Sequence, residues 1–172
     1  MIRKLNVAAL SVALILGAAI PAAAQVSKQS GVSIRAGFAF PTSSGSSSKN
    51  SVFAAGLDYK LSNLSMQGMP NTTSAYYGFS VDYLGKNSAR SVPVVLTVTG
   101  RNNEFFYTAG AGVAFNQFPN GAANRNQSQF AYMFGLGYDF QSGQNPFFVE
   151  AKYLGTTQTQ LNGVGFYVGV RF

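Results

Sequence analysis

The chain has 172 residues and a formal net charge of +7, yet only 10% of its residues are charged, well below the roughly 25% usual for soluble domains. It contains no His and no Cys, which excludes disulfides, a Ser-His-Asp triad, a thiol nucleophile and zinc sites built on these ligands. Glycine and aromatic residues are abundant instead, with 19 Gly, 15 Phe and 9 Tyr. Such a chain needs either an unusually large core or a non-aqueous solvent, and we expect neither an enzyme nor a bound cofactor.

The first 24 residues are predicted to be a cleaved signal peptide. Arg3 and Lys4 precede an apolar run, 7–20, which ends in the small-residue pattern PAAAQ, typical of a cleavage site after Ala24. The run is shorter than the roughly 20 residues of a membrane-spanning helix, and an uncleaved anchor is the alternative. We therefore expect a single exported domain at 25–172.

Eight segments of this domain alternate large apolar residues with small or polar ones. Since side chains of a strand point to opposite faces with period two, the alternation predicts β-strands. In chain order the segments are 32–40, 52–61, 75–84, 91–99, 104–115, 129–140, 147–154 and 163–172. The segment 91–99 is the weakest, because both faces are fairly apolar and Pro93 cannot donate to a β-ladder. Outside the signal peptide, no window keeps a helical i, i+3, i+4, i+7 pattern.

Turn residues separate these segments, and the connections differ in character along the chain. Those after odd-numbered segments are rich in Ser, Asn, Thr, Gln and Gly and are expected to be outer loops, at 41–51, 85–91, 116–128 and 155–162. Two of the others, GRNN and QSGQNP, are expected to be tight turns. The segment 62–74 is long for such a turn. Ten-residue alternating segments joined in this way are typical of an all-β, eight-stranded, antiparallel up-and-down transmembrane β-barrel.

The size of the side chains predicts which face of the barrel points outward. Most of the Phe and Tyr residues share the apolar face, whereas the other face carries Gly, Ala, Ser, Thr and nearly all of the charges within strands. The interior of an eight-stranded barrel is just wide enough to be filled by side chains, so the rings would not fit inside. We therefore expect them to face lipid, with aromatic girdles at both interfaces. The alternative is an exported soluble barrel that binds an apolar ligand inside.

Four acidic and four basic residues fall on the inward face, and they are the first set of candidate site residues: Arg35, Asp58, Lys60, Asp82, Asp139, Glu150, Lys152 and Arg171. Because a desolvated charge costs several kcal/mol unless it is paired, we expect a charge network across the lumen. By strand depth, Arg35 is expected near Glu150, and Arg171 near Asp139. Such a network would either plug the lumen or form a narrow pore with a charged constriction. Inward glycines suggest room there for water or ions.

The closing stretch, GVGFYVGVRF, places Phe166, Val168, Val170 and Phe172 on one face. It resembles the C-terminal β-signal of bacterial outer-membrane proteins, and the exported chain resembles the small eight-stranded barrels of the OmpX/OmpA kind in the porin-like superfamily. The resemblance implies a monomer located in the outer membrane. It also implies that the barrel-assembly machinery recognises the last strand, with Phe172 as its terminal mark.

The basic residues of the expected outer loops form the other candidate set: Lys49, Lys86, Arg90 and Arg125. They would attract the phosphates of outer-leaflet lipid, including lipopolysaccharide, or would act only as solvated charges. Nucleic acid is not an expected partner of an exported membrane barrel. The function favoured by the sequence is a structural or surface-interaction role with a mostly filled lumen. The alternatives are a narrow channel for water, ions or small solutes, and the soluble carrier described above.

Overall fold

The computed structural model describes residues 31–42, 51–64, 73–86, 89–120, 123–140, 146–157 and 162–172. The predicted signal peptide and Lys49 lie outside these residues. Within them, no helix is long and apolar enough to cross a membrane.

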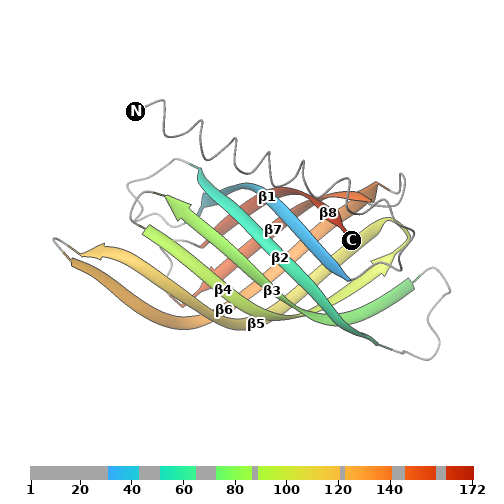
Figure 1. Ribbon diagram of the computed structural model, residues 1–172, viewed down its shortest axis with the longest axis horizontal. Helices are drawn as coiled ribbons and strands as arrows, with labels where there is room; N and C mark the ends of the chain where they lie inside the picture. The colour runs from blue at the N-terminus through green and yellow to red at the C-terminus, as the bar shows by residue number, and fades with distance from the viewer. Residues whose placement is uncertain are drawn as a thin grey trace.

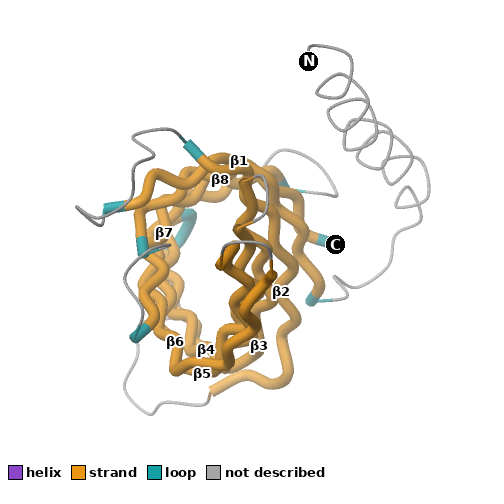
Figure 2. Tube along the Cα trace, turned by 90° about the vertical axis from the view of Figure 1, so that its left-hand side faces the viewer, coloured by secondary structure: helices purple, strands orange, loops and turns teal. Residues whose placement is uncertain are grey.

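Eight strands close into one barrel in chain order, with β1 paired to β8 and every pairing antiparallel (Figures 1 and 2). The strands are β1 (Val32–Pro41), β2 (Val52–Leu64), β3 (Thr73–Lys86), β4 (Ala89–Asn102), β5 (Phe105–Asn120), β6 (Ala123–Phe140), β7 (Phe147–Thr156) and β8 (Gly163–Arg171). Each strand contains most or all of one predicted segment. The all-β, eight-stranded, antiparallel up-and-down fold is therefore confirmed.

An even number of strands places the start of β1 and the end of β8 at the same end of the barrel, which we call the terminal end; the opposite one is the loop end. At the terminal end, β4 and β5 are joined by the turn predicted from GRNN. Asn102 pairs with Phe105, and Asn103 between them adopts a φ of 52°. Asn tolerates this left-handed conformation better than most residues, which explains its place in a tight hairpin. Of the other predicted turn, QSGQNP, residues 141–145 lie outside the described part.

Two expected outer loops are strand instead. The pairing of β5 with β6 continues to Asn120 and Ala123, across most of 116–128, and β3 pairs with β4 as far as Lys86 and Ala89. The β5–β6 hairpin consequently extends beyond the other strands at the loop end (Figure 1). The prediction was wrong because alternation marks only strand residues with one apolar face. Backbone pairing does not need it and continues where both faces are polar.

The candidate basic residues at this end are therefore strand residues and not loop residues. Lys86 belongs to β3, Arg90 to β4 and Arg125 to β6. Arg90 is exposed and pairs through its backbone with Gln117 of β5.

Pro93 interrupts the pairing of β4 with β3, as its sequence position predicts. Pro93 pairs with Ala114 of β5, but the β3–β4 ladder passes directly from Val81↔Val94 to Leu84↔Ser91. Because proline has no N–H, the interruption falls where its donor is missing. The strand itself continues on both sides of the proline.

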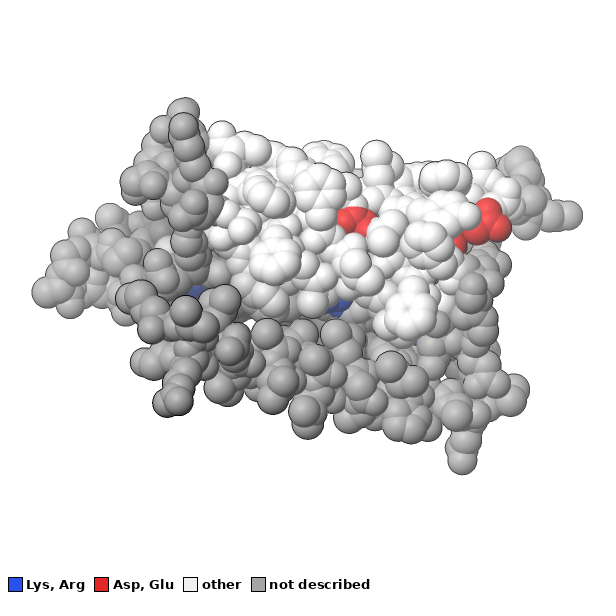
Figure 3. All heavy atoms as spheres, turned by 90° about the horizontal axis from the view of Figure 1, so that it is seen from above, with Lys and Arg blue, Asp and Glu red and all other residues white. Residues whose placement is uncertain are grey.

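The barrel wall reverses the polarity of a soluble protein. Large apolar side chains are exposed on its outer surface, with Leu136 at 69% and Phe105 at 64% of full exposure. Charged side chains are buried inside, with Arg35 and Lys152 at 1% and Asp139 at 0%. On the face shown in Figure 3, most of the described surface is uncharged, apart from two groups of acidic atoms and traces of basic ones.

Candidate functional site

The lumen is the candidate site, because alternate residues of all eight strands point into it and most of the strand charges are there. Its middle holds the central charge cluster, which comprises Arg35, Asp58, Asp82, Glu150 and Lys152. These five residues come from β1, β2, β3 and β7. Residues far apart in the sequence therefore meet only because the sheet closes on itself.

Arg35 is the hub of this cluster, and its side chain is 0% exposed. Its guanidinium forms ion pairs with Asp58, with Asp82 at 2.6 Å and with Glu150 at 3.5 Å. Nη2 also donates to Ser80 Oγ at 2.8 Å. The planar donor fork of arginine suits it to several acceptors at once, which lysine could not match.

Lys152 supplies the second cation. Its Nζ lies 3.4 Å from Asp82 Oδ2 and 3.8 Å from Glu150 Oε1. The Tyr167 ring lies beside both cations, with its centroid 5.5 Å from Arg35 Cζ and 5.8 Å from Lys152 Nζ. The cluster therefore contains three carboxylates and two cations, an excess of one negative charge if all are ionised. Removing one partner from such a buried group leaves uncompensated charge.

A second group, the terminal cluster, lies nearer the terminal end. The carboxylate of Asp139, which is 0% exposed, forms ion pairs with Arg101 and with Arg171, whose Nε lies 2.8 Å from Oδ1. Arg171 is also held between two rings, with its Cζ 4.6 Å from the Phe106 centroid and 4.5 Å from that of Phe148. The two rings are in edge-to-face contact at 5.7 Å. Cation–π and ring contacts thus fix Arg171 across the lumen.

Toward the loop end, apolar side chains and a few buried polar ones, such as Ser91 and Asn116, replace the charges. Ten buried residues form one cluster there, which we call the apolar plug: Ala39, Val52, Ala54, Leu84, Val95, Ala114, Ala131, Met133, Leu154 and Tyr167. The inward faces of the strands thus change from charged to uncharged along the barrel axis.

Several inward glycines lie beneath large side chains, which occupy part of the expected spare room. A Cβ on Gly56 would collide with Asp82 and lie 2.8 Å from Nη2 of Arg35, and one on Gly137 would collide with the Phe106 ring. The same relation holds for Gly165 with Tyr167 and for Gly169 with Phe148. Glycine is required at these positions because a bulky neighbour approaches the backbone closely.

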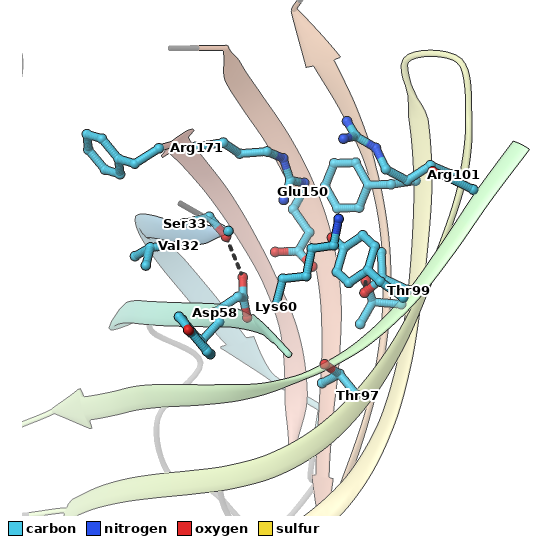
Figure 4. Close-up of a pocket in the computed structure, with 16 residues that line it drawn as sticks. Val32, Ser33, Asp58, Lys60, Thr97, Thr99, Arg101, Glu150 and Arg171 are labelled. Carbon is cyan, nitrogen blue, oxygen red and sulfur yellow. Dashed lines mark hydrogen bonds between the residues drawn. The ribbon is translucent and has the colours of Figure 1, made fainter. Parts of the chain in front are cut away.

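A cavity lies at the terminal end, and we call it the terminal cavity. It has a volume of about 100 Å³ and is lined by charged and hydroxyl side chains from most of the strands. Figure 4 shows Lys60, Arg101 and Arg171 pointing into it, with Glu150 beyond them. Ser33 donates to Asp58 at 3.3 Å along its wall.

The predicted inward residues therefore divide into three groups. Arg35, Asp58, Asp82, Glu150 and Lys152 meet in the central charge cluster, and Asp139 meets Arg171 in the terminal cluster. Lys60 belongs to neither. Its Nζ lies 5.1 Å from the Tyr76 centroid, and no carboxylate of the described residues lies within 4 Å of it.

The residues of the closing stretch differ in exposure, although Phe166, Val168 and Val170 alternate along β8 and share one face. Phe166 and Val168 are 58% and 61% exposed, whereas Val170 is 8% exposed and Phe172 is half-buried. The backbone N–H of Phe172 donates to Val32 O at 2.8 Å, which ties the stretch to β1.

Sequence reasoning did not assign Arg101 to the lumen. It was placed in a turn, although extending the alternation of 91–99 by one more period puts Arg101 on the same face as Thr97 and Thr99. Phe106, Phe148 and Tyr167 also fall on the inward face of the alternation, but the residue pattern indicates no role for them. Among the described residues there is no group of three or more potential metal ligands.

No protein-family model matches the chain, and comparison with curated proteins finds no match. Among solved structures, the chain is similar to the Yersinia pestis outer membrane protein Ail in a phospholipid bilayer nanodisc, with 17% identity, a TM-score of 0.46, and coverage of 82% of this chain and 98% of that one. It is also similar to the N-terminal β-barrel domain of Pseudomonas aeruginosa OprF, with 15% identity, a TM-score of 0.48, and coverage of 84% and 97%. The fold itself is established by the strand pairing of this chain.

Proposed function

We propose that this chain is an integral outer-membrane β-barrel protein whose lumen is closed, and that it has a structural or surface-interaction role. The observation that carries the proposal is the reversed polarity of the wall. Its exposed residues include Leu96 at 68% and Phe134 at 59%. Exposing so much apolar surface to water would be strongly unfavourable, whereas in a bilayer it is the expected surface of a closed barrel.

The same observation argues against the soluble carrier. A lipocalin-like barrel keeps its apolar residues inside around a ligand. In this barrel the middle of the lumen holds five charged side chains of the central charge cluster, and no apolar ligand would replace their ion pairs.

Three layers along the axis support a closed lumen. The terminal cluster crosses it with Arg171 between Phe106 and Phe148. The central charge cluster follows, and the apolar plug lies beyond it. An ion would have to break the ion pairs of Arg35 and then cross the plug without water, and both steps are costly.

An outer-membrane barrel of this kind would have its terminal end in the periplasm and its loop end outside. The protruding β5–β6 hairpin would then be the largest described element offered to the cell exterior. The nearby Arg90 is exposed, and its positive charge suits contact with a hydrated, phosphate-bearing surface such as lipopolysaccharide.

The test is single-channel conductance of refolded residues 25–172 in a planar bilayer. We expect a folded, inserted barrel that produces no current steps. Folding is checked by the heat-dependent gel mobility of the same sample, and insertion by resistance to alkaline extraction. Discrete steps whose ion selectivity changes in Glu150→Gln would contradict the closed lumen and support the narrow channel. Release into buffer without detergent would contradict the membrane assignment.

A further inference from the structure

The terminal cavity combines two charged surfaces that the proposed role does not use. Its volume of about 100 Å³ is enough for about three water molecules and too small for a sugar or a nucleotide. It lies at the terminal end, where Val32 begins β1 and Arg171 ends β8. A ligand could therefore enter from the compartment that faces this end without crossing the barrel.

The rim of the cavity carries an excess of positive charge. Lys60, Arg101 and Arg171 line it (Figure 4), and in the described part of the chain only one side-chain carboxylate, that of Asp139, pairs with any of them. Asp139 and the C-terminal carboxylate of Phe172, which also lines the cavity beside Gly31, balance two of these three cations and leave one positive charge over. Guanidinium and ammonium groups in this arrangement suit a carboxylate or another oxyanion.

The floor of the cavity carries the opposite charge. Asp58 and Glu150 line it, and both belong to the central charge cluster, where carboxylates exceed cations by one. Glu150 is 5% exposed, and its Oε2 accepts no hydrogen bond although Arg35 Nε lies 3.5 Å away. This oxygen is in an ion pair with Arg35 but accepts no hydrogen bond, so it can accept one from a donor in the cavity.

From these features we infer that the terminal cavity binds a small zwitterion, an α-amino acid of the size of glycine or alanine. Its ammonium group would donate to Glu150, and its carboxylate would lie among Lys60, Arg101 and Arg171. A simple anion would be attracted by the cations of the rim but repelled by the negative floor. A simple cation would be attracted by the carboxylates of the floor but repelled by the positive rim. Only a molecule with both charges satisfies both surfaces.

The experiment is a titration of the refolded barrel in neutral detergent with glycine, followed by isothermal calorimetry at constant ionic strength. Acetate and methylammonium, the two halves of glycine, are titrated in parallel. We expect saturable binding of glycine, about tenfold or more tighter than either half, the difference that one charge-assisted hydrogen bond contributes. Acetate or methylammonium binding as tightly as glycine would overturn the zwitterion site, and so would the absence of saturable binding.

Two variants locate the site. Glu150→Gln and Lys60→Met should each weaken glycine binding about tenfold or more. Lys60 is the more informative residue, because it makes no ion pair with a described carboxylate and its loss should leave the barrel folded. The matched control for Glu150→Gln is Glu104→Gln, in the β4–β5 turn at the same end but outside the cavity lining. Unchanged binding in Lys60→Met, or equal loss in Glu104→Gln, would overturn the assignment.

Discussion

Replacing Arg35 with Met tests the energetics of the central charge cluster. The substitution keeps much of the volume of the side chain and removes its charge. In the native barrel Arg35 is completely buried and forms ion pairs with Asp58, Asp82 and Glu150. After the change, Lys152 alone faces three carboxylates, and the excess of negative charge grows from one to two.

The size of the effect follows from burial. Removing one partner of a buried ion pair costs about 3–5 kcal/mol, because the remaining charge is left without compensation. Asp82 and Glu150 have side chains only 1% and 3% exposed, so water cannot replace the lost cation there. Asp58 is 31% exposed and can be partly rehydrated. We therefore expect Arg35→Met to reduce the free energy of unfolding by about 3–5 kcal/mol, more than a hundredfold in the folding equilibrium.

The measurement is equilibrium unfolding in urea of residues 25–172 refolded into lipid vesicles. Because the chain has no Trp, the folded fraction is followed by gel mobility without heating. Arg35→Lys, which keeps the charge but loses the donor fork, should be destabilised less. The double variant Arg35→Met, Asp82→Asn restores an excess of one negative charge and should recover part of the loss. A single variant within about 1 kcal/mol of the native barrel, or a double variant no more stable than the single one, would refute the reasoning.

Three further substitutions test other parts of the barrel. Leu136→Arg on the exposed wall should cost about 2–4 kcal/mol in vesicle unfolding, whereas Leu136→Ala should cost less, and a neutral Leu136→Arg would argue against lipid contact. Gly137→Ala should cost about 1–3 kcal/mol because its methyl group collides with the Phe106 ring and with the carbonyl oxygen of Val149, and Phe106→Leu should relieve the part of the cost that comes from the ring; no relief at all would mean that the ring contributes nothing to it. Phe172→Ser should lower the amount of heat-modifiable barrel in the outer membrane of cells and leave refolding in vitro intact. Equal loss in both assays would assign Phe172 a structural role and not one in assembly.

The sequence predictions that were wrong concern features that depend on pairing with another strand. The segment 116–128 was expected to be a loop because its residues are polar, yet β5 and β6 remain paired as far as Asn120 and Ala123. A strand that is polar on both faces shows no apolar–polar alternation in its sequence. It can be recognised only from its pairing with a neighbouring strand. Arg101 was not predicted to face the lumen because it lies near the end of β4, where the polar β4–β5 turn begins.

The sequence alone determined the eight strands, the closed up-and-down fold and the face to which each side chain points. These features depend on period-two alternation and on side-chain size, and both are local properties of one strand. Strand depth predicted that Arg35 lies near Glu150 and Arg171 near Asp139, and both pairs are present. Only the tertiary structure decided that Arg35 also joins Asp58 and Asp82, that Arg101 joins Asp139, and that Lys60 remains apart. The depth of a residue in the lumen depends on the register of every ladder between it and its partner, and on how the closed sheet staggers its strands. Alternation within a strand contains no information about that register.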